Sequence, residues 1–453
     1  MGNASLFSLA AIRKVAAGPI ARGSILSLVI KLAGMGLAFI QGILAARILG
    51  ADGYGYIAFA MSVIQIFSVI ALFGFGDLAI REIPRLNSAG ARSELLGFLR
   101  AAACVTATFS LFLGVAFVLL GSNLGIFQYL AQSSIILITL LAVLFTGTRL
   151  MRSVAQGFGA VVLAQIPGEV LRPFVVVSVL IGAIWIGLVW NIDRFLTLYL
   201  AASLAAFLTA VGACLLLLRN ILPATQSGHA ESRSNITDAL PLFGLSVLVI
   251  LQSELATVML ALFASPEQTG LYQPVARLTP IIALPASAVA MRYAPRISEF
   301  WNSDQASRLV AVTRTYTLVT AGLTALVAIV IAGLGPWILL AFGPEFVASA
   351  PLLWIVGAAQ IFNTSCGPVG NLLVMTGQTR AATTTKLAGL LCAVAAALML
   401  VPSHGAMGAA LAVAAGLVAW NVTALIAVRK ILGFDPSILQ FLSRTKSSID
   451  TSR

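Results

Sequence analysis

Residues 24–48 read SILSLVIKLAGMGLAFIQGILAARI, and only Lys31 and Arg47 carry charge in this stretch. The hydrocarbon core of a bilayer is about 30 Å thick, so an α-helix needs about 20 apolar residues to cross it. A helix also satisfies its own backbone hydrogen bonds, as lipid surroundings require. The stretch therefore predicts a transmembrane helix.

The same pattern recurs along the whole 453-residue chain, which is 60% hydrophobic and only 9% charged. Its mean hydropathy is +1.02. A soluble domain would carry about 25% charged residues. We therefore predict an all-α integral membrane protein with about twelve transmembrane helices. The expected spans are 24–48, 56–80, 96–120, 133–156, 161–186, 195–218, 239–263, 270–293, 309–333, 349–374, 386–402 and 406–428.

Basic residues outside these spans fall almost entirely on one side of the membrane. If the N-terminus is cytoplasmic, only Arg47 and Arg194 lie on the opposite side. Loops rich in Lys and Arg remain in the cytoplasm. A wrong number of spans would scramble this alternation, so the bias predicts an even number, with both termini cytoplasmic.

The longest polar connection, residues 219–238, divides the spans into two sets of six. A faint internal repeat agrees: Asp52 precedes Gly55 by three residues, and Glu267 precedes Gly270 by three, after the first helix of each set. Repeated halves are common in transporters. We predict two six-helix bundles, an N-terminal one at 24–218 and a C-terminal one at 239–428, joined by a cytoplasmic linker at 219–238. A cytoplasmic N-terminal tail at 1–23 and a cytoplasmic C-terminal tail at 429–453 complete the chain.

Sequence patterns for catalysis or metal binding are lacking. The chain has no Asp-x-Asp pair, no Gly-Lys pair of a P-loop and no Gly-x-Ser-x-Gly elbow. Its two histidines, His229 and His404, both fall in predicted loops. The net charge of +12 is not gathered in Lys/Arg blocks with interleaved aromatic residues. We therefore expect neither an enzyme nor a metal site, and no nucleic-acid partner.

Ionisable residues inside the predicted spans are the candidates for function. A charge at the bilayer centre costs on the order of 2.5–3.5 kcal/mol, so it persists where it lines a cavity, pairs or reaches the interface. Arg172 lies near the middle of the fifth span, with Glu169 three residues before it and Pro167 and Pro173 close by. The prolines predict a disturbed helix. Arg172 either lines a transport site or pairs with Glu169.

Other deep charges leave similar alternatives open. Arg277 lies in the eighth span, where Pro274, Pro280 and Pro285 predict bends, and Glu254 is deep in the seventh. Arg277 is a candidate for a functional role, and Glu254 either pairs with an arginine of another helix or binds a proton or cation. Lys31 in the first span either lines a cavity or extends its long side chain to the interface, and Arg149 and Arg152 in the fourth are further candidates for lining a cavity. Asp77 at the end of the second span is expected to pair with Arg81 four residues later.

Basic residues outnumber acidic ones within the predicted spans, which favours an anionic cargo. Arginine supplies 22 of the 27 basic residues, and its planar guanidinium matches diphosphate oxygens bidentately. A polyprenyl-diphosphate sugar has this charged group between a lipid tail and a polar head. The composition thus indicates transport of a lipid-linked anion.

Five patches, spread along the chain, carry a family resemblance. They are residues 45–55 (AARILGADGYG), Gly74-Phe75-Gly76 with Arg81, the run from Met259 to Arg277, Phe342-Gly343-Pro344-Glu345-Phe346 with Ala350-Pro351-Leu352, and Gly405-Ala406-Met407-Gly408-Ala409-Ala410. In this order they resemble the polysaccharide-type, Wzx-like flippases of the multidrug/oligosaccharidyl-lipid/polysaccharide exporter (MOP) superfamily, and residues 45–55 resemble the first hairpin of that family.

The resemblance implies two six-helix, MATE-like bundles around a central cavity that opens to alternate sides. It implies a flippase in the bacterial inner membrane that moves a polyprenyl-diphosphate-linked oligosaccharide outward for surface polysaccharide biosynthesis. Its partners would be this anionic lipid-linked oligosaccharide, membrane lipids, and a polysaccharide polymerase with export machinery. No cofactor is implied, and coupling to a proton or sodium ion is left open.

We expect five residues to bind the headgroup and three acids to act in coupling or gating. The expected binding residues are Arg172, Arg277, Lys31, Arg149 and Arg152, and the acids are Glu169, Glu254 and Asp77. One alternative is a cation-coupled multidrug exporter of the same fold, which would need a more acidic cavity. The others are a membrane glycan polymerase or ligase, with an outer-loop catalytic acid or base, and a membrane scaffold without transport.

Overall fold

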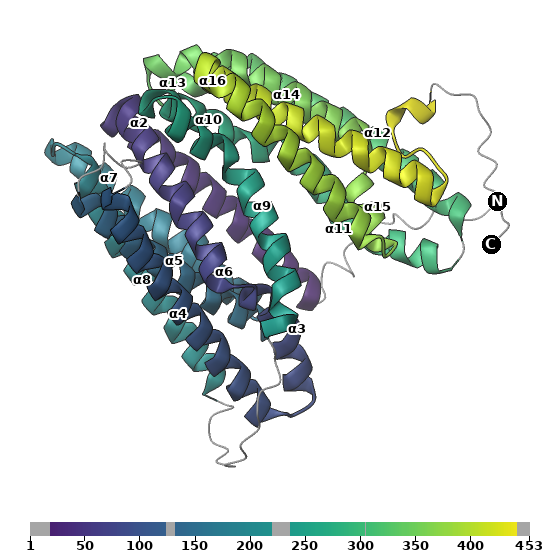
Figure 1. Ribbon diagram of the computed structural model, residues 1–453, viewed down its shortest axis with the longest axis horizontal. Helices are drawn as coiled ribbons and strands as arrows, with labels where there is room; N and C mark the ends of the chain where they lie inside the picture. The colour runs from purple at the N-terminus through teal and green to yellow at the C-terminus, as the bar shows by residue number, and fades with distance from the viewer. Residues whose placement is uncertain (1–18, 124–131, 220–235, 304, 442–453) are drawn as a thin grey trace. The chain divides into compact units, whose positions relative to one another are not determined.

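The computed structural model describes residues 19–123, 132–219, 236–303 and 305–441 (Figure 1). Every regular element in these ranges is a helix, as predicted. Residues 1–18 of the predicted N-terminal tail, most of the linker and residues 442–453 of the predicted C-terminal tail lie outside the described residues, whereas residues 19–23 already belong to the first helix. Large apolar side chains stand exposed on the outer helix faces, as Leu111 and Phe112 do, and this is the surface expected of a multi-pass membrane protein.

The first and last long helices, α2 (Pro19–Leu72) and α16 (Thr379–Leu432), each contain 54 residues. Straight helices of that length would extend about 80 Å, far beyond a bilayer core. Each instead contains one non-helical glycine, Gly50 with φ 67° and Gly405 with φ 51°. These positive φ angles favour glycine because it lacks a Cβ.

Ten described helical stretches are long and apolar enough to span a membrane. Two of them are α2 and α16, which are each divided at a glycine. Counting the two parts of α2 and of α16 separately gives twelve candidate spans in the described residues, and each overlaps a predicted span, with ends that differ by up to nine residues.

The chain forms two compact units. The first holds the described residues up to Ala45 together with Val63–Ile250, and the second holds Ala46–Ser62 together with the described residues from Leu251 onward. Two helices, α2 and α9 (Ile236–Phe263), therefore contribute residues to both units. The sequence prediction had assigned each helix to a single bundle.

The described residues of the first unit form helices of very different lengths. Besides its parts of α2 and α9, it contains α3 (Phe75–Ser88), α4 (Arg92–Asn123), α5 (Gln132–Gly157), α6 (Val161–Gln165), the π-helix η1 (Ile166–Leu171), α7 (Arg172–Ile186) and α8 (Ile192–Leu218).

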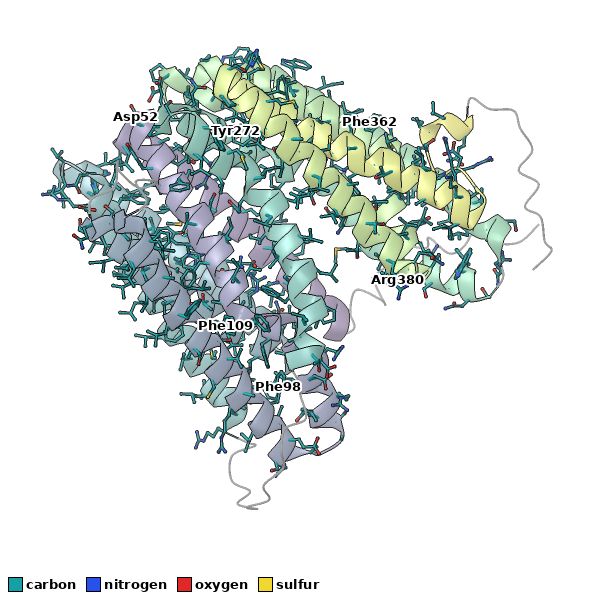
Figure 2. All side chains as sticks on the ribbon, viewed as in Figure 1. Asp52, Phe98, Phe109, Tyr272, Phe362 and Arg380 are labelled. Carbon is teal, nitrogen blue, oxygen red and sulfur yellow. The ribbon has the colours of Figure 1, made fainter. Side chains whose placement is uncertain are left out.

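The core of the first unit includes fully buried Phe75, Leu78 and Phe98. Beside it, Phe73 lies between Phe109, labelled in Figure 2, and the ring of Phe243, with both pairs of ring centroids 4.7 Å apart. The ring of Phe73 thus joins the turn between α2 and α3 to α4 and to α9.

The second unit contains α10 (Pro266–Ile282), α11 (Leu284–Asn302), α12 (Ala306–Gly333), α13 (Gly335–Leu340), the 3-10 helix η2 (Pro344–Ser349), α14 (Ala350–Ser365), α15 (Val369–Met375), α16 and the 3-10 helix η3 (Ile438–Phe441). The break between α10 and α11 falls at Ala283, two residues before Pro285. Phe434, Ser437 and Gln440 are buried, so the chain after α16 packs onto this unit.

Two glycines bring the starts of two helices into backbone contact in the second unit. A Cβ at Gly55 in α2 would lie 1.8 Å from the carbonyl oxygen of Pro266, and one at Gly270 in α10 would lie 1.9 Å from that of Ala51. The two glycines of the predicted internal repeat therefore meet each other. Small residues permit such close helix crossings in membranes.

Candidate functional site

The fifth predicted span is broken in its middle by η1, the π-helical segment. The backbone N–H of Arg172 bonds to the carbonyl of Pro167, five residues back, which is π-helical geometry. Pro173 has no N–H to donate, so the carbonyl of Glu169 lacks its α-helical partner. This confirms the disturbance predicted from Pro167 and Pro173.

The first part of α2 packs closely against this segment. A Cβ added at Gly34 would lie 2.6 Å from the carbonyl oxygen of Glu169. Seven residues before Gly34 in α2, the hydroxyl of Ser27 donates a hydrogen bond to Oε1 of Gln165 at 3.0 Å. Lys31 lies four residues after Ser27 and three before Gly34, which places it on the same helix face, and it is exposed.

One face of α5 carries Phe145, Arg149 and Arg152, spaced at i, i+4 and i+7. The guanidinium of Arg152 forms an ion pair with Oε1 of Glu169 at 2.6 Å. Arg149 donates from Nη2 to Oε1 of Gln65 in α2 at 2.7 Å. The middle of α5 therefore presents two arginines, one bound to a carboxylate and one to a neutral amide.

Arg172 lies half-buried over two aromatic rings. Its guanidinium carbon is 3.9 Å from the ring centroid of Phe145 and 5.7 Å from that of Tyr199 in α8. Its Nε is buried without a hydrogen-bond partner among the described residues. A guanidinium stacked on aromatic faces gains cation–π stabilisation, which partly offsets its loss of water.

The sequence left open whether Arg172 pairs with Glu169. In the structure Glu169 pairs with Arg152 instead. The reason is geometric: a π-helix has more residues per turn than an α-helix, so residues three apart no longer align on one face. The second carboxylate oxygen of Glu169, Oε2, is buried without a hydrogen-bond partner in the described part of the chain.

We call the set Lys31, Arg149, Arg152, Arg172 and Glu169 the basic cluster. All five belong to the first unit: Glu169 lies in η1, and the others lie on helices that contact η1 or form its continuation. The helices around this segment thus carry four basic residues, and the segment contributes one carboxylate. Such an excess of positive charge at membrane depth suits an anionic ligand and disfavours a cationic one.

Two further candidates, Arg277 and Glu254, belong to the second unit. The guanidinium of Arg277 is 5.8 Å from the ring centroid of Tyr54, which is fully buried. Glu254 accepts a hydrogen bond from the hydroxyl of Ser62 at 2.6 Å. An arginine beside an aromatic ring therefore occurs in each unit.

Asp77 does not form the predicted pair with Arg81. Its Oδ2 accepts a hydrogen bond from Ser246 in α9 at 2.6 Å. Arg81 instead pairs with Glu82 at 3.0 Å, and Glu82 also pairs with Arg85 at 2.6 Å. The prediction was wrong because Glu82 presents a carboxylate directly beside Arg81, whereas Asp77 faces another helix.

Sequence reasoning missed the aromatic and amide partners of the charges. Phe145, Tyr199 and Tyr54 lie on other helices than the arginines they contact, so no local spacing joins them. One signal was available: Phe145 shares the α5 face of Arg149 and Arg152. Among the described residues, no group of three or more His, Cys, Asp or Glu residues is placed to hold a metal ion.

Solved structures of MOP superfamily transporters share this fold. An inward-facing multidrug resistance MATE family transporter superimposes with TM-score 0.66 at 12% identity, covering 90% of this chain and 98% of that chain. The lipid II flippase MurJ gives TM-score 0.66 at 12% identity, with 90% and 87% covered. A MOP superfamily transporter from Pyrococcus furiosus, described by the reverse polarity of its binding pocket, gives 0.57 at 14% identity, with 91% and 95% covered.

Two sequence comparisons bear on the family of the chain. No curated protein matches the chain. A family model described as polysaccharide biosynthesis protein matches residues 20–301, which is more than half of the chain. The fold is that of transporters and flippases, and the chain belongs to the polysaccharide biosynthesis protein family.

Proposed function

We propose that this protein is a flippase that moves a polyprenyl-diphosphate-linked oligosaccharide from the cytoplasmic to the outer leaflet. The product would feed the synthesis of a surface polysaccharide such as O-antigen, capsule or exopolysaccharide. The observation that carries the proposal is Arg172: it is half-buried, stacked on Phe145, and makes no ion pair with a described carboxylate.

A diphosphate is the ligand whose chemistry best fits such an arginine. Its oxygens accept two parallel hydrogen bonds from a guanidinium, and its charge compensates the arginine where water is scarce. The other basic side chains, Arg149, Arg152 and Lys31, would supply further positive charge. In this mechanism the polyprenyl tail stays in lipid while the headgroup binds the basic cluster.

The charge balance also distinguishes the proposal from its main rival. A multidrug exporter of cationic compounds needs carboxylates that remain available to the drug. In the basic cluster the one carboxylate, Glu169, is already bound by Arg152 at 2.6 Å. An anionic cargo therefore fits this part of the first unit better than a cationic one.

We further propose a setting for this activity. The bias of Lys and Arg toward one set of loops favours a protein with both termini in the cytoplasm, and the family supports placing it in the inner membrane of bacteria. Glu254 and Asp77 each hold a serine hydroxyl at 2.6 Å, and we assign to them, with Glu169, a role in coupling to a proton or sodium ion. A polysaccharide polymerase would receive the flipped product.

Reconstitution tests the proposal. Proteoliposomes carry a polyprenyl-diphosphate oligosaccharide with a fluorescent sugar label in both leaflets, and an impermeant reductant destroys the label that is outside. A flippase brings nearly all of the label outside, whereas liposomes without protein keep the inner-leaflet half. Loss of this activity in Arg172→Gln, at equal reconstituted amounts, is the expected result. A wild-type protein that moves ethidium but not the lipid-linked sugar contradicts the proposal and supports the multidrug exporter.

A further inference from the structure

Two arginines of the basic cluster are held in different ways. The guanidinium carbon of Arg172 is 3.9 Å from the ring centroid of Phe145, and no carboxylate of the described residues forms an ion pair with it. Arg152 is neutralised by Glu169 at 2.6 Å. A bound anion meets the charge of Arg172 directly, but it meets Arg152 only in competition with Glu169.

Both arginines connect α5 with the segment that runs from η1 into α7. Arg152 of α5 pairs with Glu169 of η1 at 2.6 Å. Arg172, which stacks on Phe145, begins the turn that follows Glu169. One ligand with two adjacent anionic groups can therefore address both guanidiniums.

The contacts of the ion pair between Arg152 and Glu169 allow Arg152 to exchange the carboxylate for another anion. The side chains of Arg152 and Glu169 are 40% and 22% exposed, so the pair is accessible rather than sealed. Oε2 of Glu169 has no hydrogen-bond partner in the described residues, so only Arg152 anchors the carboxylate. The backbone of Glu169 is confined by Gly34, so the carboxylate moves by side-chain rotation and not by a shift of η1.

We infer that Glu169 is an internal competitor that stands in for the second phosphate of the ligand. This inference rests on the proposed function. One phosphate binds Arg172 without displacing anything, and the second reaches Arg152 only by displacing the Glu169 carboxylate. Arg152 favours a diphosphate over a monophosphate, because only a ligand with a second anionic group reaches it, and Glu169 reduces this preference by competing for Arg152.

Short prenyl ligands test the inference on the purified, full-length protein in nanodiscs. Farnesyl diphosphate and farnesyl monophosphate are titrated against the wild type and Glu169→Gln, a variant of nearly the same shape. We expect the variant to bind the diphosphate about three- to tenfold more tightly, in line with the strength of a partly exposed ion pair. Binding of the monophosphate should change by less than about twofold on the same scale.

Two further variants make the result specific. Glu94→Gln removes an exposed carboxylate of α4 outside the basic cluster and should leave both affinities unchanged. Arg152→Gln should weaken diphosphate binding, and on that background Glu169→Gln should have no further effect, because its partner is gone. A gain that persists without Arg152 overturns the inference.

Failure of the inference is distinguishable from failure of the proposed function. If Glu169→Gln leaves diphosphate binding unchanged or weakens it, while Arg172→Gln still abolishes it, the internal competitor is wrong and the anion site stands. If the wild type binds farnesyl diphosphate no better than farnesol, both the inference and the proposed function fail.

Discussion

The guanidinium carbon of Arg172 lies 3.9 Å from the centroid of the Phe145 ring. The two residues belong to α7 and α5, so the contact joins the helix after the π-helical segment to the face that carries Arg149 and Arg152. A cation–π contact of this kind contributes about 2 kcal/mol when it is shielded from water. It holds a positive charge in a membrane helix without neutralising it.

Phe145 is therefore expected to position Arg172 for its ligand. Replacement of Phe145 with leucine keeps an apolar side chain but removes the ring, and affinity for farnesyl diphosphate should fall about three- to tenfold. Titration of the purified variant measures this. Phe112→Leu, at a ring that is 68% exposed on α4, is the matched control and should bind like the wild type. Equal affinity in all three proteins would show that the ring does not position the charge.

Gly34 should be the residue that sets the distance between α2 and η1. A Cβ at this position meets the carbonyl oxygen of Glu169 at 2.6 Å, and overpacking of this kind costs about 1–3 kcal/mol. We expect Gly34→Ala to lower the melting temperature in detergent and to reduce transport. Gly36→Ala lies on the same helix with nothing within 4 Å of the added carbon and should melt like the wild type. The same melting temperature for both variants contradicts the close packing.

Gly270 should be more sensitive than Gly34, because its added Cβ would lie 1.9 Å from the backbone oxygen of Ala51. Backbone atoms on both sides leave no flexible side chain to yield. Gly270→Ala is expected to abolish a monodisperse peak in size-exclusion chromatography or to lower the melting temperature more than Gly34→Ala does. Gly322→Ala, with open space around the added carbon, is its control in the same unit and should behave as wild type.

Arg277 gives a prediction for the second unit. Its neighbour is the buried ring of Tyr54, 5.8 Å away, so the charge lies at depth. If Arg277 binds the headgroup, Arg277→Gln should reduce flipping of the labelled lipid-linked sugar about tenfold or more, in line with loss of a charge-assisted hydrogen bond. The exposed Arg380, labelled in Figure 2, supplies the control Arg380→Gln. Transport at the wild-type rate in both variants removes Arg277 from the site.

The sequence predicted the helices better than the partners of the charged residues. Apolar length alone identifies a span, so the twelve crossings and the disturbance at Pro167 and Pro173 were accessible. The partner of Glu169 was not, because an α-helical spacing places it beside Arg172, whereas the segment folds as a π-helix and Glu169 pairs with Arg152.

Contacts between helices explain the other differences between the predictions and the structure. Asp77 was expected to pair within its own helix, but Ser246 of α9 supplies its partner. Residues 46–62 continue α2 in sequence and yet group with the second unit. In that unit Gly55 packs against Gly270, and the sequence showed the two glycines only as a faint repeat.

Binding of a diphosphate to Arg172 is tested most directly by titrating farnesyl diphosphate against the wild type and Arg172→Gln in nanodiscs. Arg100→Gln, at an exposed arginine of α4, serves as the charge-matched control. Loss of a charge-assisted contact should weaken binding about ten- to a hundredfold in Arg172→Gln and leave the control unchanged. Equal affinity in the wild type and Arg172→Gln would contradict the assignment of Arg172 as the headgroup anchor.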